Sequence, residues 1–432
     1  MRDTARRHGG KGREHGLIQW LQPCASHFPR PVSPLHLTHF TATSCIGTGL
    51  DDTLSALREQ RGGLAPCRFG DVRLDTWIGE VPGVEAVTLP PALADFECRN
   101  NRLALLALEQ DGFADRVREA VARYGADRIG VFLGTSTAGV LQTELAYRQR
   151  DPQTGALPAG FSYAGTHSPY SLPGLVRAYF GLKGPAAAVS SACSSGAKVF
   201  ASARRLMEAG LIDAAVVGGV DSLCHTTLYG FDSLELLSDQ PCRPSDADRN
   251  GISIGEAAAF VLVERAPEPE QAPEGAVLLL GIGESSDAHH MSAPHPEGLG
   301  ARMAMAQALA SAGVAPAQVD YVNLHGTATR ANDAAEARAL NALLPGTPCS
   351  STKGATGHTL GAAGALEAVI CSLALRHGLL PGGINTTQVD PALALDYRLA
   401  SQEQPLRHVL SNAFGFGGSN CSLLLGRATS GQ

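Results

Sequence analysis

Apolar and polar positions along the chain predict strands that alternate with helices. Residues 35–43 alternate in polarity, which predicts a strand, and 51–60 then has the spacing of a helix. Continuous apolar runs predict buried strands, and helical spacing predicts one or two helices within 98–124. Further strands are expected at 129–134, 214–221, 256–264, 277–283, 319–324 and 421–425, and further helices at 301–312, 334–343 and 360–375. The pattern is that of an α/β protein.

The segment from Gly184 to Gly210 combines a short apolar run, a turn of small residues at Cys193, and a stretch with helical spacing. Cys193 is therefore expected at the mouth of a helix, where free N–H groups and the helix dipole favour a thiolate. Residues 350–378 repeat this plan with another helix rich in Ala and Gly. The repetition predicts a duplicated fold whose two small-residue helices pack against each other.

A chain of 432 residues suits two domains or one duplicated domain. The segment 267–275, rich in Pro and Glu, is the best candidate linker and divides the chain into halves at 35–266 and 276–427. Residues 1–34 are basic and lack periodicity, so we expect a poorly ordered extension. The Gly- and Pro-rich stretch 149–171 predicts a long loop that shapes an entrance or contacts a partner.

Composition narrows the class of protein. Hydrophobic content of 44% with 17% charged residues is typical of a soluble globular protein, and no run of about eighteen apolar residues predicts a membrane span. A net charge of −7 gives no global attraction to nucleic acid or to anionic membranes. The ten cysteines include no CxxC pair, which argues against zinc-ribbon and thioredoxin-like sites. We expect a reducing, cytoplasmic compartment.

Three reactive side chains follow predicted strands and lie beside small residues: Cys193, His325 and His358, with Lys353 shortly before the last. Each alone would ordinarily be a structural residue. Together, a thiolate and two imidazoles suit acyl chemistry, because sulfur can hold an acyl group while imidazole N–H groups stabilise an enolate oxygen. The Phe- and Gly-rich loop 414–418 has the character of a gate, and its backbone could form an oxyanion hole with Cys193.

Four separated stretches carry a resemblance to a known family: 189–196 around Cys193, 323–329 around His325, 351–364 from Ser351 through Lys353 and His358, and 412–420. Over residues 35–427 the chain resembles the β-ketoacyl-acyl-carrier-protein synthases, the condensing enzymes of the thiolase superfamily, in their stand-alone form. The resemblance implies a thiolase-like duplicated α/β fold, with two related halves in αβαβα layers. It also implies decarboxylative condensation of an acyl thioester with malonyl-carrier protein, in fatty-acid or polyene/polyketide-type biosynthesis.

The same resemblance implies roles for individual residues. Cys193 would carry the acyl chain, His325 and His358 would promote decarboxylation, and Lys353 would support them, paired with Glu367. The implied substrate-binding residues are the gate residue Phe416 with its loop neighbours Phe414 and Gly417. Thr327 and Thr329 are implied to contact the pantetheine arm. No metal or redox cofactor is implied. The implied partners are acyl carrier protein and a second synthase subunit, identical or related.

Three alternatives remain. A non-catalytic subunit resembling a chain-length factor would lack the nucleophile, whereas this chain keeps Cys193 and both histidines. A thiolase-like coenzyme A acyltransferase would use a second cysteine, where this chain has the 414–420 loop. A cysteine hydrolase would need water in the site. Residues 220–230 and 242–249 resemble the branch associated with aryl polyene-type clusters more than housekeeping synthases.

Other polar residues support weaker hypotheses. The histidines at 289, 290 and 295 match no common zinc spacing, and we expect a loop near the acyl pocket instead. Asp333 and Glu336 are expected to cap a helix or form salt bridges. Arg204 and Arg205 could contact an acidic carrier protein, although arginines on a helix surface are usually just solvated.

Overall fold

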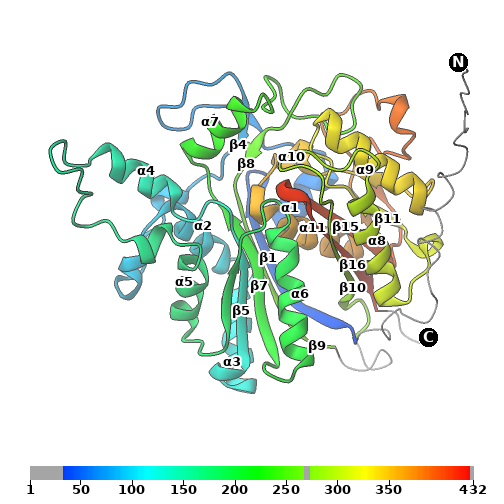
Figure 1. Cartoon of the computed structure of the whole chain (residues 1–432). Helices are drawn as coiled ribbons and strands as arrows, with labels where there is room; N and C mark the ends of the chain where they lie inside the picture. Colours follow the sequence, from blue (N-terminus) through cyan, green and yellow to red (C-terminus); the bar gives the residue numbers. More distant parts are fainter. Residues whose placement is uncertain (1–32, 267–272, 429–432) are drawn as a thin grey trace, which may run out of the picture.

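A large mixed sheet runs through the protein, with helices on its outer faces and between its two halves (Figure 1). The structure is a computed structural model that describes residues 33–266 and 273–428. The predicted N-terminal extension, apart from its last two residues, and most of the predicted linker therefore lie outside the described residues.

The first half of the sheet has the strand order β1-β9-β7-β5-β6. Parallel pairing joins β5 to β6 and β7, whereas β9 is antiparallel to both β7 and β1. The strands are β1 (Leu35–Ser44), β5 (Ile129–Gly134), β6 (Ala186–Val189), β7 (Ala214–Asp221) and β9 (Ala257–Arg265). The apolar runs predicted as buried strands are confirmed, since β5 and β7 are buried throughout.

The second half repeats this arrangement in the order β10-β16-β15-β11-β12. Again β11 is parallel to both neighbours, and β16 is antiparallel to β15 and β10. The strands are β10 (Val277–Ser286), β11 (Tyr321–Asn323), β12 (Cys349–Ser350), β15 (His408–Gly415) and β16 (Ser419–Arg427). A short antiparallel pairing at Leu35 and Leu279 joins the halves. The predicted duplication is thus present in the strand pairing itself.

Helices form three layers around the two halves of the sheet (Figure 1). The central layer holds α6 (Ser195–Glu208) and α11 (Ala363–His377). One outer layer holds α2 (Arg99–Leu108), α3 (Phe113–Tyr124) and α5 (Ser171–Phe180). The other holds α8 (Leu299–Ala312) and α9 (Arg330–Leu343). This is the αβαβα order expected for a thiolase-like fold.

The two central helices touch through small residues, as their composition predicted. A Cβ added at Gly196 on α6 would lie 2.8 Å from the backbone N of Ala365 on α11. A Cβ at Gly364 would lie 2.7 Å from the backbone N of Ala197. Real Cβ contacts are not this short, so the helices can pack at this distance only with glycine at both positions.

Several elements were not predicted. They include α4 (Val140–Arg148) and α7 (His225–Ser233), which each bury a single residue and so show no strong apolar period. With α4, the predicted loop 149–171 forms an arm that projects from the body (Figure 1). The helix predicted at 51–60 is confirmed as α1 (Leu50–Arg58). Shorter elements are α10 (Lys353–Thr356), β2 (Gly47–Thr48), β3 (Ala65–Pro66), β4 (Trp77–Gly79), β8 (Ile254–Gly255), β13 (Leu379–Leu380) and β14 (Gln402–Glu403).

One apolar helical segment is as long and as apolar as a membrane span. Leu360–His377, which contains α11 and the turn before it, has the length and composition to cross a membrane, and 89% of it is buried inside the protein. It contains Glu367 and Arg376, so it is not an unbroken apolar run. A core helix passes the same test of length and composition, and α11 occupies the central layer.

Candidate active site

Cys193 lies on a tight turn between β6 and α6. The preceding residue, Ala192, has φ +52°, a left-handed conformation that costs roughly 1–2 kcal/mol for a residue with a Cβ. Local hydrogen bonds hold the turn: the Ser191 N–H donates to Ser195 Oγ at 2.9 Å, and the Ser195 hydroxyl donates to the Ala192 carbonyl at 2.6 Å. The small residues of this stretch therefore build a bend that presents the sulfur ahead of the helix.

The thiol of Cys193 does not have the lowered pKa that its place near a helix mouth predicted. Burial raises the pKa to about 11, because the thiolate loses its hydration, and this outweighs the opposing field of the Lys353 ammonium. Backbone N–H groups of Phe416 and of Cys193 itself also lower it, by hydrogen bonding to the sulfur. The thiol is thus protonated at rest, and the thiolate has hydrogen-bond donors ready when it forms.

His358 points its Nε2 at the nucleophile, 3.1 Å from Cys193 Sγ. Its Nδ1 accepts a hydrogen bond of 3.2 Å from the Leu360 N–H, and Leu360 adopts φ +53° to supply it. Burial, and next the Lys353 charge, hold the pKa of His358 well below its usual range. The ring is therefore neutral with its proton on Nε2, and it acts as a hydrogen-bond donor toward the cavity.

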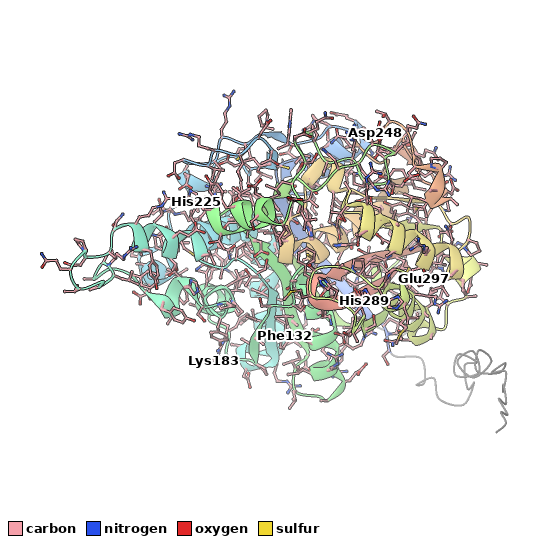
Figure 2. All side chains as sticks on the ribbon, turned by 45° about the horizontal axis from the view of Figure 1, so that its top comes forward. Phe132, Lys183, His225, Asp248, His289 and Glu297 are labelled. Atoms are coloured by element: carbon pink, nitrogen blue, oxygen red, sulfur yellow. The ribbon has the colours of Figure 1, made fainter. Side chains whose placement is uncertain are left out.

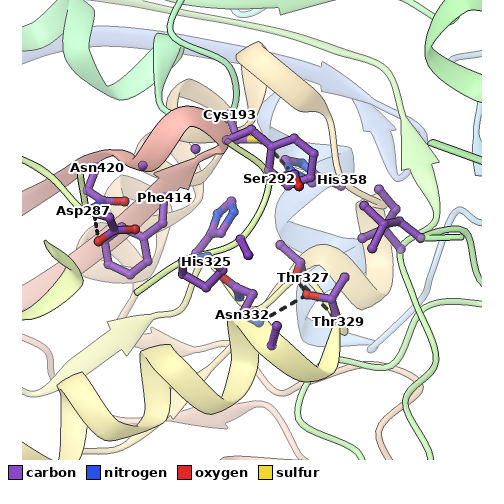
Figure 3. Close-up of a pocket in the computed structure, with 18 of the residues that line it drawn as sticks. Cys193, Asp287, Ser292, His325, Thr327, Thr329, Asn332, His358, Phe414 and Asn420 are labelled. Atoms are coloured by element: carbon purple, nitrogen blue, oxygen red, sulfur yellow. Dashed lines mark hydrogen bonds between the residues drawn. The ribbon is translucent and has the colours of Figure 1, made fainter. Parts of the chain in front are cut away.

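His325 follows β11, and like His358 it has its Nδ1 held by a hydrogen bond. Its Nδ1 lies 3.4 Å from the Lys353 ammonium, which donates to it, so the ring proton is again on Nε2. Burial, followed by the Lys353 charge, holds the pKa of His325 well below its usual range. The centroids of the His325 and His358 rings are 5.3 Å apart, and the rings meet edge to face. Two neutral N–H donors therefore converge beside Cys193 (Figure 3).

Lys353 forms the predicted ion pair with Glu367 on α11. Both side chains are buried, at 1% and 3% exposure, so neither charge is compensated by water. The ammonium also faces His325 Nδ1. Lys353 consequently fixes the tautomer of His325, while Glu367 keeps the ammonium in place.

Glu336 has a role that the sequence analysis did not identify. Instead of capping a helix, its carboxylate accepts the His325 and Gly326 N–H groups at 2.8 Å each, and Asn412 Nδ2 at 3.1 Å. Burial raises the pKa of Glu336 to about 7, although these hydrogen bonds lower it. Glu336 therefore joins the His325 turn to β15. Its neighbour Asp333 forms the expected salt bridge, with Arg249 at 3.4 Å.

A cavity opens above the cysteine and the histidines (Figure 3). Four of the predicted substrate-binding residues line it: Phe414, Phe416, Thr327 and Thr329. The fifth, Gly417, does not; its N–H instead donates to the Met291 carbonyl at 2.7 Å. Additional lining residues are Phe231, Leu236, Ile252, Asp287, Asn332 and Asn420, with Ser292, Ala293 and Pro294 from one loop. The lining is therefore mixed: apolar side chains are joined by polar groups at Thr327, Thr329 and Asn332 and at the hydrogen-bonded pair Asp287 and Asn420.

The tip between β15 and β16 closes one side of the cavity. The Phe416 ring packs against Phe231 with centroids 5.7 Å apart. Gly415 allows the close approach, since a Cβ there would lie 2.9 Å from the Ser191 carbonyl and 3.2 Å from the Cys193 nitrogen. The N–H groups of Phe416 and Cys193 both lower the pKa of the Cys193 thiol, and backbone donors of this kind beside the sulfur could form an oxyanion hole.

The remaining sequence predictions concern a metal site, the loop at 289–295 and two arginines. In the part of the chain that the structure describes, the side chains close enough to share a metal ion are Cys193, His325 and His358, within 4.8 Å, and the 289–295 histidines are not among them. The loop that carries those histidines borders the cavity, as expected. Arg204 is buried and donates to the Leu279 carbonyl, so it is no surface contact, whereas Arg205 pairs with Glu284.

Comparisons with known proteins agree with this geometry. Residues 100–268 match the family described as "Beta-ketoacyl synthase, N-terminal domain", and residues 276–387 match its C-terminal domain. The chain is 34% identical over 422 residues to 3-oxoacyl-acyl-carrier-protein synthase 2 of a Synechocystis strain, covering 90% of this chain and 96% of that protein.

Two further relatives extend the comparison. A mitochondrial 3-oxoacyl-acyl-carrier-protein synthase of Arabidopsis thaliana is 38% identical over 284 residues, which are 60% of this chain and 61% of that protein. Among solved structures, the chain is similar to the ketosynthase ApeO in complex with its chain length factor ApeC from Xenorhabdus doucetiae. The TM-score is 0.82 at 39% identity, over 92% of this chain and 98% of that chain.

Proposed function

The chain belongs to the β-ketoacyl synthase family and is a 3-oxoacyl-acyl-carrier-protein synthase, and we propose that Cys193, His325, His358 and Lys353 perform its condensation. The Cys193 thiol and the Nε2–H donors of His325 and His358 meet in one buried cavity, and the proposal rests on this arrangement. A non-catalytic subunit would not need this set. The 414–418 loop supplies no second thiol, which disfavours a thiolase-like acyltransferase.

In the first step, Cys193 takes the acyl group from its carrier. The sulfur attacks the thioester carbonyl, the Cys193–acyl bond forms, and the carbon–sulfur bond to the pantetheine arm breaks. The thiol proton leaves with the pantetheine sulfur, so the products are an acyl-enzyme and a free carrier thiol. Because the resting thiol has a pKa of about 11, the thiolate forms only during attack, with His358 Nε2–H donating to it.

In the second step, malonyl-carrier protein enters and loses carbon dioxide. The electrons of the broken carbon–carboxylate bond form an enolate, whose oxygen accepts the Nε2–H bonds of His325 and His358. The enolate carbon attacks the acyl carbonyl on Cys193, where the N–H groups of Cys193 and Phe416 stabilise the developing oxyanion. The carbon–sulfur bond to Cys193 then breaks, and the released thiolate takes a proton from solvent. The product is β-ketoacyl-carrier protein.

The cavity mouth supports roles for three more residues. Thr327 and Thr329 present hydroxyl groups 2.9 Å apart along the cavity, where they can bind the amide-rich pantetheine arm. Thr329 also caps α9 by accepting the Asn332 N–H. Phe416 lines the cavity that contains the nucleophile and packs against Phe231, and it serves as the gate that moves when the second substrate enters.

Mass spectrometry tests the nucleophile. The protein is incubated with acyl-carrier thioesters of several lengths, and intact and peptide masses are compared between wild type and Cys193→Ala. We expect an acyl adduct on the peptide containing Cys193 that is absent from the variant. Folded protein that forms no adduct with any primer would contradict the proposed role and favour the non-catalytic subunit.

We further propose that the chain acts in an aryl polyene-type pathway, as the catalytic subunit of a heterodimer with a chain-length-factor-like protein. Support comes from the resemblance at 220–230 and 242–249 and from the similarity to a ketosynthase bound to its chain length factor. The strand β6 also ends the sheet, and its four residues are apolar and only half-buried. Such an edge can be extended by a second subunit.

Co-expression tests the pathway and the partner. The chain is produced alone and with ApeC, and native mass spectrometry follows the complex. We expect a one-to-one complex and an increase in the length of the polyketide product. Formation of an active homodimer alone, together with full rescue of a strain that lacks its housekeeping synthase, would contradict this proposal and leave the condensation reaction intact.

A further inference from the structure

Helix α7 forms part of the cavity wall although it buries little apolar surface of its own. Among its nine residues only Leu228 is fully buried. Near its end Phe231 lines the cavity and meets the gate residue Phe416. Leu228 and Phe231 pack into an apolar cluster with Phe69, Ile252 and Ile254, and polar contacts at the other end of the helix add to this packing.

Those contacts centre on His225, the first residue of α7, which Figure 2 labels. The imidazole is 11% exposed and lies between two carboxylates. Its Nδ1 is 2.9 Å from Glu144 Oε2 on α4, and its Nε2 is 2.7 Å from Asp71 Oδ1. A carboxylate ion only accepts hydrogen bonds, so the ring must carry a proton on each nitrogen to make both. His225 then joins three separate segments of the chain.

One of these carboxylates, that of Glu144, also binds the backbone of α7. Glu144 accepts the N–H groups of His225 at 3.0 Å and Thr226 at 2.6 Å, so it caps the helix with a negative charge at its positive end. Asp71 is paired with Arg148 on α4 at 3.0 Å. The pKa of Asp71 is lowered, first by its hydrogen bond from His225 and then by Arg148. The contacts form a closed set between α4, α7 and the loop that carries Asp71.

We propose that His225 is a positioning residue for acyl-chain selection: by joining Asp71 to Glu144 it fixes α7, and thereby sets Phe231 as the wall of the acyl cavity. This inference rests on the proposed function, since it concerns the acyl chain carried by Cys193. We expect a long acyl group to make more contacts than a short one with the apolar lining formed by Phe231, Leu236 and Ile252, so the rate of its transfer should depend more on the position of α7.

The test compares acylation of Cys193 by octanoyl- and acetyl-carrier thioesters in wild type and His225→Phe. Phenylalanine keeps a ring at this position and removes both N–H groups. Loss of contact for about one methylene group corresponds to about a four- to fivefold change in rate. We therefore expect the ratio of octanoyl to acetyl rate constants to fall about fivefold. The same ratio should fall in Glu144→Ala, which removes the carboxylate that both caps α7 and accepts from His225.

The matched control is His167→Phe. His167 also lies on the arm and bonds a side chain of α4, with its Nδ1 2.7 Å from Thr143 Oγ1, but it has no contact with α7 among the hydrogen bonds of the described residues. Its variant should keep the wild-type ratio. In a Phe231→Ala background, His225→Phe should change the ratio no further, because the wall that it positions is already gone.

The possible outcomes separate the two proposals. If wild type forms no adduct with either primer, the proposed function fails. If adducts form but the ratio in His225→Phe stays within twofold of wild type at equal Tm, the positioning role is wrong. It is also wrong if the effect of His225→Phe is unchanged in the Phe231→Ala background, because the helix would then act through some other part of the cavity.

Discussion

Replacement of His358 by alanine tests the central chemical claim, that two neutral imidazoles stabilise an enolate. His358 and His325 are 3% and 2% exposed, so water cannot take over the hydrogen bond that either one loses. Removal of one preorganised oxyanion donor costs about 100- to 1,000-fold in rate, or about 2.7–4 kcal/mol. We expect a loss in this range for malonyl decarboxylation by His358→Ala, and a similar loss for His325→Ala.

The double variant distinguishes a shared oxyanion from two separate roles. If both N–H groups bind one oxygen, the losses are not additive, and His325→Ala with His358→Ala should be less impaired than the product of the single effects. The assay is carbon dioxide release from malonyl-carrier protein, measured after Cys193 has been acylated to completion. This order separates decarboxylation from thiol ionisation. His408→Ala, which alters a ring bonded to the Gln318 carbonyl, serves as the control and should retain the wild-type rate.

The pH profile provides a second test of the same claim. Burial and the Lys353 charge hold the pKa of both imidazoles well below its usual range, so both stay neutral as pH falls through the region where an ordinary histidine gains a proton. Neither imidazole should therefore produce a titration step in decarboxylation between about pH 6 and 8, and a step there should come from Glu336, whose pKa is about 7, and be absent from Glu336→Gln. A step near the ordinary histidine pKa that persists in Glu336→Gln, or a loss below tenfold in folded His358→Ala, would refute the reasoning.

Three further predictions concern stability and are measured by urea unfolding. Glu367→Ala leaves the Lys353 ammonium buried without its partner and should cost about 3–5 kcal/mol, whereas Glu403→Ala, which breaks only an exposed ion pair, should cost less than about 1 kcal/mol. Ala192→Val should destabilise by more than about 1 kcal/mol because φ there is +52°, and Ala192→Gly should be close to neutral. Burial raises the pKa of the Cys98 thiol to about 11. The stability that this raised pKa contributes is therefore complete below the pKa of the unfolded thiol and is lost as pH rises toward 11. Cys98→Ala should reduce the slope of the unfolding free energy against pH in this alkaline range by about 1.4 kcal/mol per pH unit.

The elements that the sequence predicted best are those whose environment is uniform along their length. The strands β5 and β7 are buried on both faces, so a continuous apolar run is sufficient to locate them. The opposite holds for α4 and α7, which bury only Ala146 and Leu228. Polar contacts with distant segments help to set their positions, and such contacts leave no period in the sequence.

The reactive side chains of the candidate site could be predicted from the sequence, whereas the role of Glu336 and the electrostatics of the site could not. Cys193, His325 and His358 were identifiable because each follows a strand and lies among small residues. The raised pKa of Cys193 was not, because proximity to a helix can be inferred locally whereas burial depends on the whole fold. The proton on His358 Nε2 likewise depends on the Leu360 N–H, which reaches Nδ1 because Leu360 has a left-handed backbone conformation. The local sequence does not predict this conformation.

The duplication explains why this fold brings the nucleophile and a histidine together. Cys193 follows β6 and His358 follows β12, and these strands hold equivalent positions in the two halves of the sheet. Each residue precedes a central helix, α6 or α11, so contact between the starts of these helices brings the sulfur within 3.1 Å of the imidazole. That contact depends on Gly196 and Gly364, where a Cβ would meet the backbone of the opposite helix. Glycine in the central layer is therefore a requirement of the catalytic geometry as well as of packing.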